Sequence, residues 1–340
     1  MKLKCVCLVP RLDGVGGMVS FQARLAEGLA QRGIETCFDL TDQPYQAVLV
    51  IGGTRNLAGL WRARRKGIPV VQRLNGMNWL HRVRRTGWRH YLRSEYGNLL
   101  LSLIRRRLAD RIVYQSSFSH QWWERVYGKT KVPWQVVYNG VDLSVYTPFG
   151  GHTRPEDCWR ILLVEGSLGG GYESGLEAAV RMAEKLRIDM QYPLEVVVVG
   201  RASSTLQADW KGRVNFPLHF NGLAPRETIP EIDRSAHLLF AADINAACPN
   251  SVIEALACGL PVIAFDTGAL TELVQGEAGL IVPYGGDPWK LDPPDIEALA
   301  RAASAVLYDQ QRYRAGARQR AEEAFGLDQM VEGYIQALEG

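Results

Sequence analysis

The sequence predicts an α/β protein made of two doubly wound halves, each with a parallel sheet covered by helices on both faces. The chain has 340 residues, which is room for about two domains at roughly 150 residues each. Apolar runs of strand length, rich in Val, Ile and Leu, alternate with helical patterns, as is typical of buried parallel strands. The alternation occurs twice along the chain, so we expect two sheets.

The first half begins with the run KCVCLVP, which predicts a first strand. An apolar pattern of helical period follows from about Met18 to Gln31, and Gly33 supplies the residue that commonly ends a helix. Further strands are predicted at ETCFDL, AVLVI, IPVVQRL and RIVYQS. We place the end of this domain, 1–145, in a segment with Asn-Gly, two prolines and two adjacent glycines, which is typical of an exposed linker.

The second half, 146–327, repeats the pattern. Its strands are predicted at RILLVEG, LEVVVVG, LHFNG, HLLFAAD, LPVIAFD and AGLIVPY. Two charged helices are predicted at Pro294–Leu307 and Asp309–Glu323, and a last amphipathic helix at Asp328–Leu338.

Composition excludes several classes of protein. The chain is 47% hydrophobic and 22% charged, which is ordinary for a globular protein. No apolar run reaches the roughly 18 residues of a membrane span, and MKLKCVCLVP is too short for the apolar core of a secretion signal. Six scattered cysteines lack metal-ligand spacing, so we expect a reduced cytoplasmic protein without a metal site.

Positive charge is concentrated in one stretch. From Arg55 to Arg111 there are fifteen Lys or Arg and two acidic residues. Within 78–111, tryptophans and leucines lie among the arginines as on an amphipathic helix. Such a helix suits an anionic membrane surface, and a long acidic polymer or a lipid-phosphate acceptor equally well. A solvated helix packed on its own sheet is an equal alternative. Nucleic acid is not expected as a partner, because the basic stretch is not accompanied by a nucleic-acid-binding motif.

A glycine-rich loop follows the first strand of each half. In PRLDGVGGM, Gly14, Gly16 and Gly17 stand between a strand and a helix, where a ligand can approach backbone amides at the positive end of the helix. Val19 occupies the place of the third glycine of a dinucleotide fingerprint, so the motif is weak for NAD, and a turn without a ligand is the alternative. The second loop, VEGSLGGGYESG, contains Gly166 and lies where open α/β sheets bind ligands.

The segment ACPNSVIEALACG predicts a helix that begins near Asn250. Asn250 or Ser251 is expected to cap this helix, leaving the amides that follow to hold phosphate. Glu254 lies one turn in and could accept hydrogen bonds from vicinal ribose hydroxyls, since an ionised carboxylate is acceptor-only. Ser251 and Glu254 also fit a capping box, in which Glu254 only satisfies backbone donors. The residues alone leave both interpretations open.

The stretch VIEALACGLPVIAFDTGALTELV, with the trailing glycine of EAGLIV, resembles the nucleotide-sugar site of retaining GT-B glycosyltransferases of family 4. QSSFSHQWWERVYG and YNGVDLSVYTP resemble the family's segment before the interdomain linker, and the resemblance covers nearly the whole chain. It implies two Rossmann-like domains whose parallel sheets face across a cleft, with residues 328–340 packing back on the first domain. The donor-binding residues that it implies are Glu254, Ser251, Val252, Asn250, Gly16, Gly17, Gly166, Gly222 and Leu223.

The chain departs from the family pattern at several positions. The family motif has a glutamate eight residues before Glu254, where this chain has Ala246, and the nearest polar substitutes are Asp243 and Asn245. The Arg and Lys that usually follow the first strand of the second domain are also missing. An arginine elsewhere would have to stabilise the leaving diphosphate. The catalytic candidates are therefore Arg73, Asn75, Asp243 and Arg201.

The resemblance implies transfer of a sugar, with retention, from a nucleoside diphosphate sugar to a glycan or lipid-linked acceptor. No cofactor besides this co-substrate and no metal is expected, because amides and cations replace it. The expected partners are the nucleotide sugar, an anionic or lipid-linked acceptor and a membrane contacted peripherally through 78–111, with the protein in the cytoplasm or at the inner face of the membrane. A sugar-nucleotide epimerase and a non-catalytic relative that binds a glycan, a lipid phosphate or a partner are the alternatives.

Overall fold

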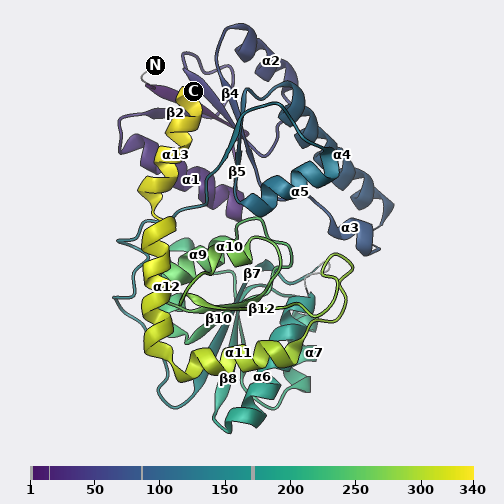
Figure 1. Ribbon diagram of the computed structural model, residues 1–340, viewed down its shortest axis with the longest axis vertical. Helices are drawn as coiled ribbons and strands as arrows, with labels where there is room; N and C mark the ends of the chain where they lie inside the picture. Colours follow the sequence, from purple (N-terminus) through teal and green to yellow (C-terminus); the bar gives the residue numbers. More distant parts are fainter. Residues whose placement is uncertain (1–2, 15, 86, 170–172) are drawn as a thin grey trace. The chain divides into compact units, whose positions relative to one another are not determined.

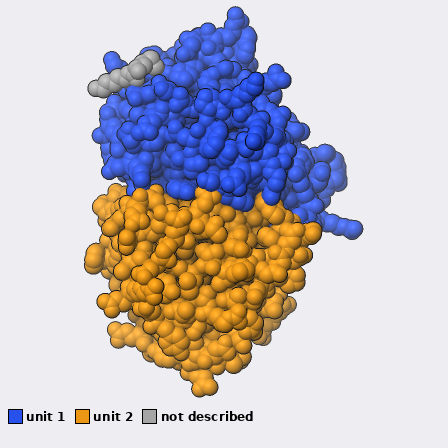
Figure 2. All heavy atoms as spheres, in the orientation of Figure 1, with its two compact units in different colours: residues 1–140, 326–340 blue, residues 141–325 orange. Residues whose placement is uncertain are grey.

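The computed structural model describes residues 3–14, 16–85, 87–169 and 173–340. The chain divides into two compact units, Met1–Gly140 with Gly326–Gly340 (unit 1) and Val141–Phe325 (unit 2), which Figure 2 colours separately. Each unit contains a six-stranded sheet whose neighbouring strands all pair in parallel. Figure 1 labels several strands of each sheet. The predicted α/β class with two parallel sheets is confirmed.

The sheet of unit 1 has the strand order β2-β1-β3-β4-β5-β6. Every residue of its central strands β3 and β4 is buried, because helices cover both faces of the sheet. The strands are β1 Cys5–Val9, β2 Glu35–Cys37, β3 Ala47–Ile51, β4 Val70–Leu74, β5 Arg111–Tyr114 and β6 Trp134–Val136. The helices are α1 Gly17–Ala30, α2 Leu57–Arg65, α3 Leu80–Val83, α4 Trp88–Arg107, α5 Ser117–Tyr127 and α13 Leu327–Glu339.

The last helix of the chain, α13, belongs to the core of unit 1. It packs on α1 and on strands β3, β4 and β5. The rings of Phe21 on α1 and Tyr334 on α13 lie with their centroids 5.1 Å apart. Gly28 lets the two helices approach closely, since a Cβ at this position would lie 2.4 Å from Cγ2 of Val331.

The sheet of unit 2 has the strand order β12-β11-β10-β7-β8-β9. Helices α6 and α11 share one apolar cluster with β7, β8 and β10, whereas α12 packs beside α9. The strands are β7 Trp159–Ser167, β8 Leu194–Arg201, β9 Leu218–Gly222, β10 Leu238–Ala241, β11 Val262–Phe265 and β12 Gly279–Val282. The helices are α6 Glu173–Met190, α7 Ser204–Arg213, α8 Ile229–Ser235, α9 Asn250–Ala257, α10 Leu270–Leu273, α11 Ile296–Tyr308 and α12 Gln310–Ala324, with a 3-10 turn at Arg226–Thr228.

Candidate functional site

The start of α9 is the first feature of the candidate site. Pro249 is the N-cap of this helix, and no side chain caps it. The expectation that Asn250 or Ser251 caps α9 is therefore wrong, because both residues lie inside the helix. The capping box fails for the same reason, since Ser251 and Glu254 both lie within the first two turns. The first turn of α9 thus has a positive end that no side-chain carboxylate or hydroxyl occupies as an N-cap.

Glu254 is 8% exposed, and its charge acts on Asp233 of α8. Its neighbour Asp233 on α8 is buried, and Oδ2 of Asp233 has no hydrogen-bond partner within the described part of the chain. Burial, followed by the charge of Glu254, raises the pKa of Asp233 well above its ordinary value, although Arg234 acts in the opposite direction. A neutral Asp233 next to Glu254 reduces the electrostatic cost of an ionised carboxylate on α9.

The loop between β10 and α9 contains Ala246, which stands at the position of the family glutamate. Asn245 has a left-handed backbone with φ of 60° and is buried, and its Nδ2 finds no acceptor among the described residues. Ala246 is also buried, and its carbonyl accepts a 2.8 Å hydrogen bond from the amide of Ala269. A Cβ on Gly268 would lie 2.5 Å from the Ala246 nitrogen and oxygen. The loop is packed too tightly against this turn to leave open space around Ala246.

Two carboxyl groups lie at the carboxyl ends of neighbouring strands in this sheet. Glu165 is near the end of β7, and Asp243 follows β10, which pairs with β7. Burial, with the charge of Asp243 adding to it, raises the pKa of Glu165 to about 8. Burial raises the pKa of Asp243 to about 6. The pair therefore holds a proton near neutral pH and can both donate and accept hydrogen bonds.

Glu165 is a site residue that the sequence reasoning missed. The register between β7 and β8 shifts between Val164 and Ser167, so the strand is irregular where Glu165 stands. Gly200 of β8 makes this possible, since a Cβ there would overlap the carbonyl oxygen of Glu165. The sequence contained a signal for this residue. Glu165 ends one apolar run, in VEG, and Asp243 ends another apolar run, in AAD.

The other predicted residues of unit 2 lie along the same edge of the sheet. Arg201 ends β8, is exposed, and pairs with Ser167 of β7. Gly166 is exposed with open space beside it. Gly222 ends β9 with φ of 69°, and the next residue, Leu223, is 40% exposed. An exposed cation and an exposed apolar side chain therefore flank the carboxyl ends of β8 and β9.

In unit 1, Gly16 and Gly17 begin α1 at the carboxyl end of β1. Gly16 is the N-cap with φ of 146°, and no side chain caps the helix. A Cβ at Gly14 or Gly16 would meet no atom within 4 Å, so the loop is open on its outer side. Gln22 holds the preceding segment, since its side chain accepts from the Leu12 amide at 2.9 Å and donates to the Pro10 carbonyl at 2.9 Å.

Arg73 and Asn75, from β4 and the residues after it, have different surroundings. Arg73 is 1% exposed, its Cζ lies 3.7 Å from the centroid of the Phe21 ring, and Nη2 donates to Oδ1 of Asn139 at 3.0 Å. Asn75 is half-buried, and its carbonyl accepts a 2.7 Å hydrogen bond from the indole of Trp123. Arg73 thus contributes its charge inside unit 1, whereas Asn75 lies at the carboxyl edge of the sheet.

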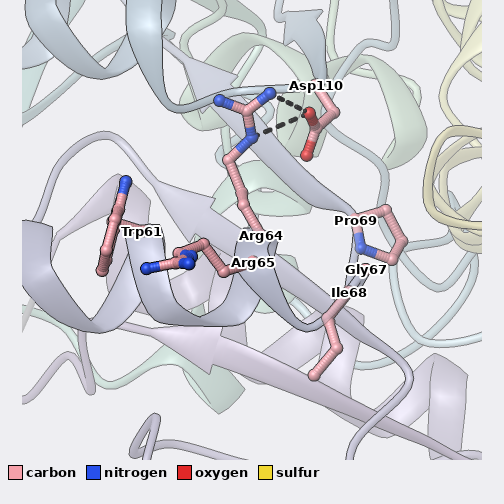
Figure 3. Close-up of a pocket in the computed structure, with 7 residues that line it drawn as sticks. All are labelled: Trp61, Arg64, Arg65, Gly67, Ile68, Pro69 and Asp110. Carbon is pink, nitrogen blue, oxygen red and sulfur yellow. Dashed lines mark hydrogen bonds and ion pairs between the residues drawn. The ribbon is translucent and has the colours of Figure 1, made fainter.

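A pocket in unit 1 lies away from these residues. It has a volume of about 430 Å³, and the ion pair between Arg64 and Asp110, 2.6 Å long, forms part of its wall (Figure 3). Pro69 and Asp110 immediately precede β4 and β5, so the pocket is at the amino ends of the strands, opposite the ligand-binding edge of α/β sheets. Within the described ranges, no group of three His, Cys, Asp or Glu side chains is placed to hold a metal ion. Among the described helices, none has the length and apolar character of a membrane span.

Two six-stranded parallel sheets with these connections define a protein of the GT-B class. Residues 160–309 match the family described as glycosyl transferases group 1, and residues 48–145 match glycosyltransferase family 4. The chain therefore contains domains of the glycosyl transferases group 1 and of glycosyltransferase family 4. The predicted resemblance to GT-B glycosyltransferases is confirmed for the family domains and the fold.

Several known proteins are similar to this chain. A GDP-mannose-dependent phosphatidylinositol dimannoside mannosyltransferase of Mycobacterium tuberculosis is 24% identical over 235 residues, covering 67% of this chain and 57% of that protein. D-inositol 3-phosphate glycosyltransferase 1 of Catenulispora acidiphila is 25% identical over 308 residues, covering 82% and 69%. The structure of HepE from Anabaena in complex with UDP-glucose aligns with a TM-score of 0.69 at 16% identity, covering 99% of this chain and 100% of that one, and supports the fold. The chain spans between 21% and 69% of the length of such curated relatives.

Proposed function

We propose that this protein transfers a sugar, with retention at the anomeric carbon, from a nucleoside diphosphate sugar to a glycan or lipid-linked acceptor. The observation that carries the proposal is the start of α9. Its amide end has no side-chain cap, and Glu254 follows one turn later, at the carboxyl edge of the unit 2 sheet. In this proposal the diphosphate binds at the amides of Ser251 and Val252, and ribose hydroxyls donate to Glu254.

The remaining donor contacts come from the same edge. Arg201 supplies an exposed cation for the diphosphate, and Leu223 beside Gly222 supplies an apolar surface for the base. The carboxyl pair of Glu165 and Asp243 offers donors and acceptors for sugar hydroxyls in place of the missing family glutamate. For unit 1 by itself, we propose that Gly16, Gly17 and Asn75 contact substrate at the carboxyl edge of its own sheet, where Arg73 donates to Asn139 and lies over the Phe21 ring.

In the proposed reaction, the bond between the anomeric carbon and the phosphate oxygen breaks as the acceptor oxygen bonds to the same face of that carbon. The acceptor hydroxyl gives its proton to the leaving phosphate oxygen. The chain must stabilise the negative charge that develops on the diphosphate, and amide groups with one arginine are suited to this task. The protein contributes positioning and charge, and we propose that it needs no metal ion.

A panel of nucleotide sugars tests the proposal. Thermal shift with UDP-, GDP- and ADP-sugars is expected to identify a stabilising donor, and NMR of the product is expected to show the donor's anomeric configuration. If the sugar changes while it stays attached to the nucleotide, the protein is an epimerase. If millimolar UDP, GDP and ADP all fail to bind in calorimetry, the protein is a non-catalytic relative and the proposal is wrong.

A further inference from the structure

Helix α4 of unit 1 exposes a row of large apolar side chains, although it also buries Ile104, and most of its buried positions are polar or charged. Trp88 is 69% exposed, Leu92 57% and Leu99 58%. The buried positions of the same helix include Ser94, Asn98, Ser102 and Arg105. A surface helix normally turns its apolar stripe toward the core. Packing of the core therefore does not account for the exposed apolar residues of this helix.

The exposed residues form one continuous stripe. They recur at intervals of four, four, three and four residues, which keeps them on one face of a helix. The stripe runs nearly the full length of α4, which Figure 1 labels. We call it the α4 stripe: Trp88, Leu92, Tyr96, Leu99 and Leu103.

Hydrogen bonds on the opposite face fix the rotation of the helix. The side chain of Asn98 accepts from the Asn78 amide at 3.0 Å and donates to the Asn78 carbonyl at 2.8 Å. Arg105 donates from Nε to the Tyr114 hydroxyl at 2.8 Å and from Nη1 to the Gly128 carbonyl at 2.9 Å. Turning the α4 stripe inward would break these buried bonds, so its exposure is a stable property of unit 1.

Positive charge surrounds the α4 stripe. Glu95 is the one acidic residue of α4, and Arg82 and His81 contact it at 2.6 and 2.7 Å. A surface hollow beside the first turn is lined by Trp88, Arg89, His90 and Arg93 with Gly87. The exposed arginines of this region are Arg82, Arg85, Arg89, Arg93, Arg106 and Arg107.

We propose that the α4 stripe docks unit 1 on the surface of an anionic lipid bilayer. Its apolar side chains enter the boundary between headgroups and acyl chains, and the flanking arginines bind lipid phosphates. A long acidic polymer would satisfy the arginines but would leave the apolar side chains in water. A second copy of the chain, paired through the same stripe, would bring arginine-rich flanks against one another. The proposal stands apart from the donor site, because it concerns binding of lipid and not transfer of sugar.

Vesicle co-sedimentation of the full chain tests the proposal. The protein is expected to bind vesicles of phosphatidylcholine and phosphatidylglycerol, to bind phosphatidylcholine alone much more weakly, and to bind less tightly as salt is raised. Replacing Trp88, Leu92 and Leu99 together by Ser is expected to weaken binding more than about 30-fold, since each apolar side chain loses its transfer into the interface. The control is Ile188→Ser in unit 2, where the side chain is 67% exposed, and it is expected to bind like wild type.

Charge reversal separates the electrostatic part. The Arg89→Glu, Arg93→Glu double variant is expected to lose on the order of 25-fold in binding, at about fivefold for each basic residue near an anionic surface. Lys129→Glu with Lys131→Glu, which are exposed on the same unit, is the matched control and is expected to change little. Far-UV circular dichroism checks that each variant is folded.

Three outcomes would overturn the proposal. If the wild-type protein does not bind anionic vesicles at low salt, the α4 stripe does not dock on a lipid bilayer. If the Ser triple variant binds an acidic polysaccharide column and vesicles as tightly as wild type does, that result assigns the surface to an acidic polymer. A dimer in sedimentation equilibrium that the triple variant dissociates, without any vesicle binding by wild type, assigns it to a second copy of the chain.

Discussion

Glu165 and Asp243 stand at the carboxyl ends of the adjacent parallel strands β7 and β10. Burial, with the charge of Asp243 adding to it, raises the pKa of Glu165 to about 8, and burial raises the pKa of Asp243 to about 6. Two carboxyl groups in such a place cannot both ionise cheaply. In the proposed function, the pair lies at the ligand-binding edge of the sheet, where a shared proton would let it donate to one sugar hydroxyl and accept from another.

The same pair predicts how stability depends on pH. The folded chain keeps a proton on each carboxyl at pH values where the unfolded chain has released it, so the native state binds more protons between about pH 4 and 8. Stability is then lost as pH rises through this window. Glu165→Gln removes the repulsion. We expect its melting temperature to exceed that of wild type at pH 8 by about 2–4 °C for each kcal/mol relieved, and the difference to vanish near pH 4.

Calorimetric scans from pH 4 to 9 measure this effect. Glu177→Gln, an exposed glutamate of α6, is the matched control and is expected to follow wild type at every pH. A Glu165→Gln curve that runs parallel to wild type across the range would show that the two carboxyls titrate normally.

Substitution of Glu254 is expected to lower the affinity for the donor without a large change in the melting temperature. Glu254→Gln keeps the size of the side chain but removes the charge that accepts from ribose hydroxyls. A hydrogen bond to a charged group contributes about 1.5–3 kcal/mol, so donor affinity is expected to fall roughly 10- to 150-fold. Calorimetry with the preferred nucleotide, beside thermal melts of the free protein, measures both quantities. A variant that melts far lower yet binds normally per folded molecule would make Glu254 a structural residue only.

Substitution of Arg201 is expected to lower catalysis more than substitution of the nearby Arg213. It is the exposed cation at the end of β8, and the diphosphate charge grows as the sugar leaves. Arg201→Ala is expected to lower kcat/KM by about 10- to 100-fold, with part of the loss in kcat. Arg213→Ala is the control, because Arg213 lies on the next helix and pairs with Asp209 at 2.8 Å. Equal kinetics for the two variants would exclude Arg201 from the site.

The sequence was sufficient for the fold, since a run such as AVLVI is fully apolar only when a parallel strand is covered on both faces. It was not sufficient for local details. A cap at Asn250 was reasonable by composition, but the chain enters α9 at Pro249, and cap position depends on backbone dihedral angles that composition does not specify. The basic stretch predicted one amphipathic helix and forms two, α3 and α4, with the arginines and the apolar residues exposed together. Glu165 escaped notice because its relation to Asp243 follows from the strand order, in which β7 lies beside β10.

His237 predicts sensitivity of unit 2 to acid. It is buried before β10, and its Nδ1 accepts a 2.9 Å hydrogen bond from the Arg160 amide, which requires the neutral ring. Burial, then the charges of Arg154, Arg314 and Arg160, lowers its pKa to about 4. Below about pH 6.5 the His237 ring binds a proton in the unfolded chain but not in the folded chain. The free energy of unfolding therefore falls as the pH is lowered from about 6.5 to 4.

His237→Asn keeps an acceptor oxygen and removes the titration. Its stability relative to wild type is expected to improve steadily from pH 7 to pH 4.5 in chemical denaturation. His152→Asn, an exposed histidine of the same unit, is expected to show no such trend. If both variants follow wild type throughout, His237 is not responsible for acid sensitivity.

The contact between α1 and α13 predicts a reversal of the usual effect of alanine in a helix. Gly28→Ala would ordinarily stabilise α1 by up to about 1 kcal/mol. Here the new Cβ would lie 2.4 Å from Cγ2 of Val331, so overpacking is expected to destabilise unit 1 by about 1–3 kcal/mol. Val331→Ala removes the obstructing methyl groups, and the double variant should be more stable than the sum of the two single changes implies. Gly212→Ala, in α7 with open space beside it, should show the ordinary gain. Additive single changes in denaturant titrations would mean that α13 does not press on α1 at this point in solution.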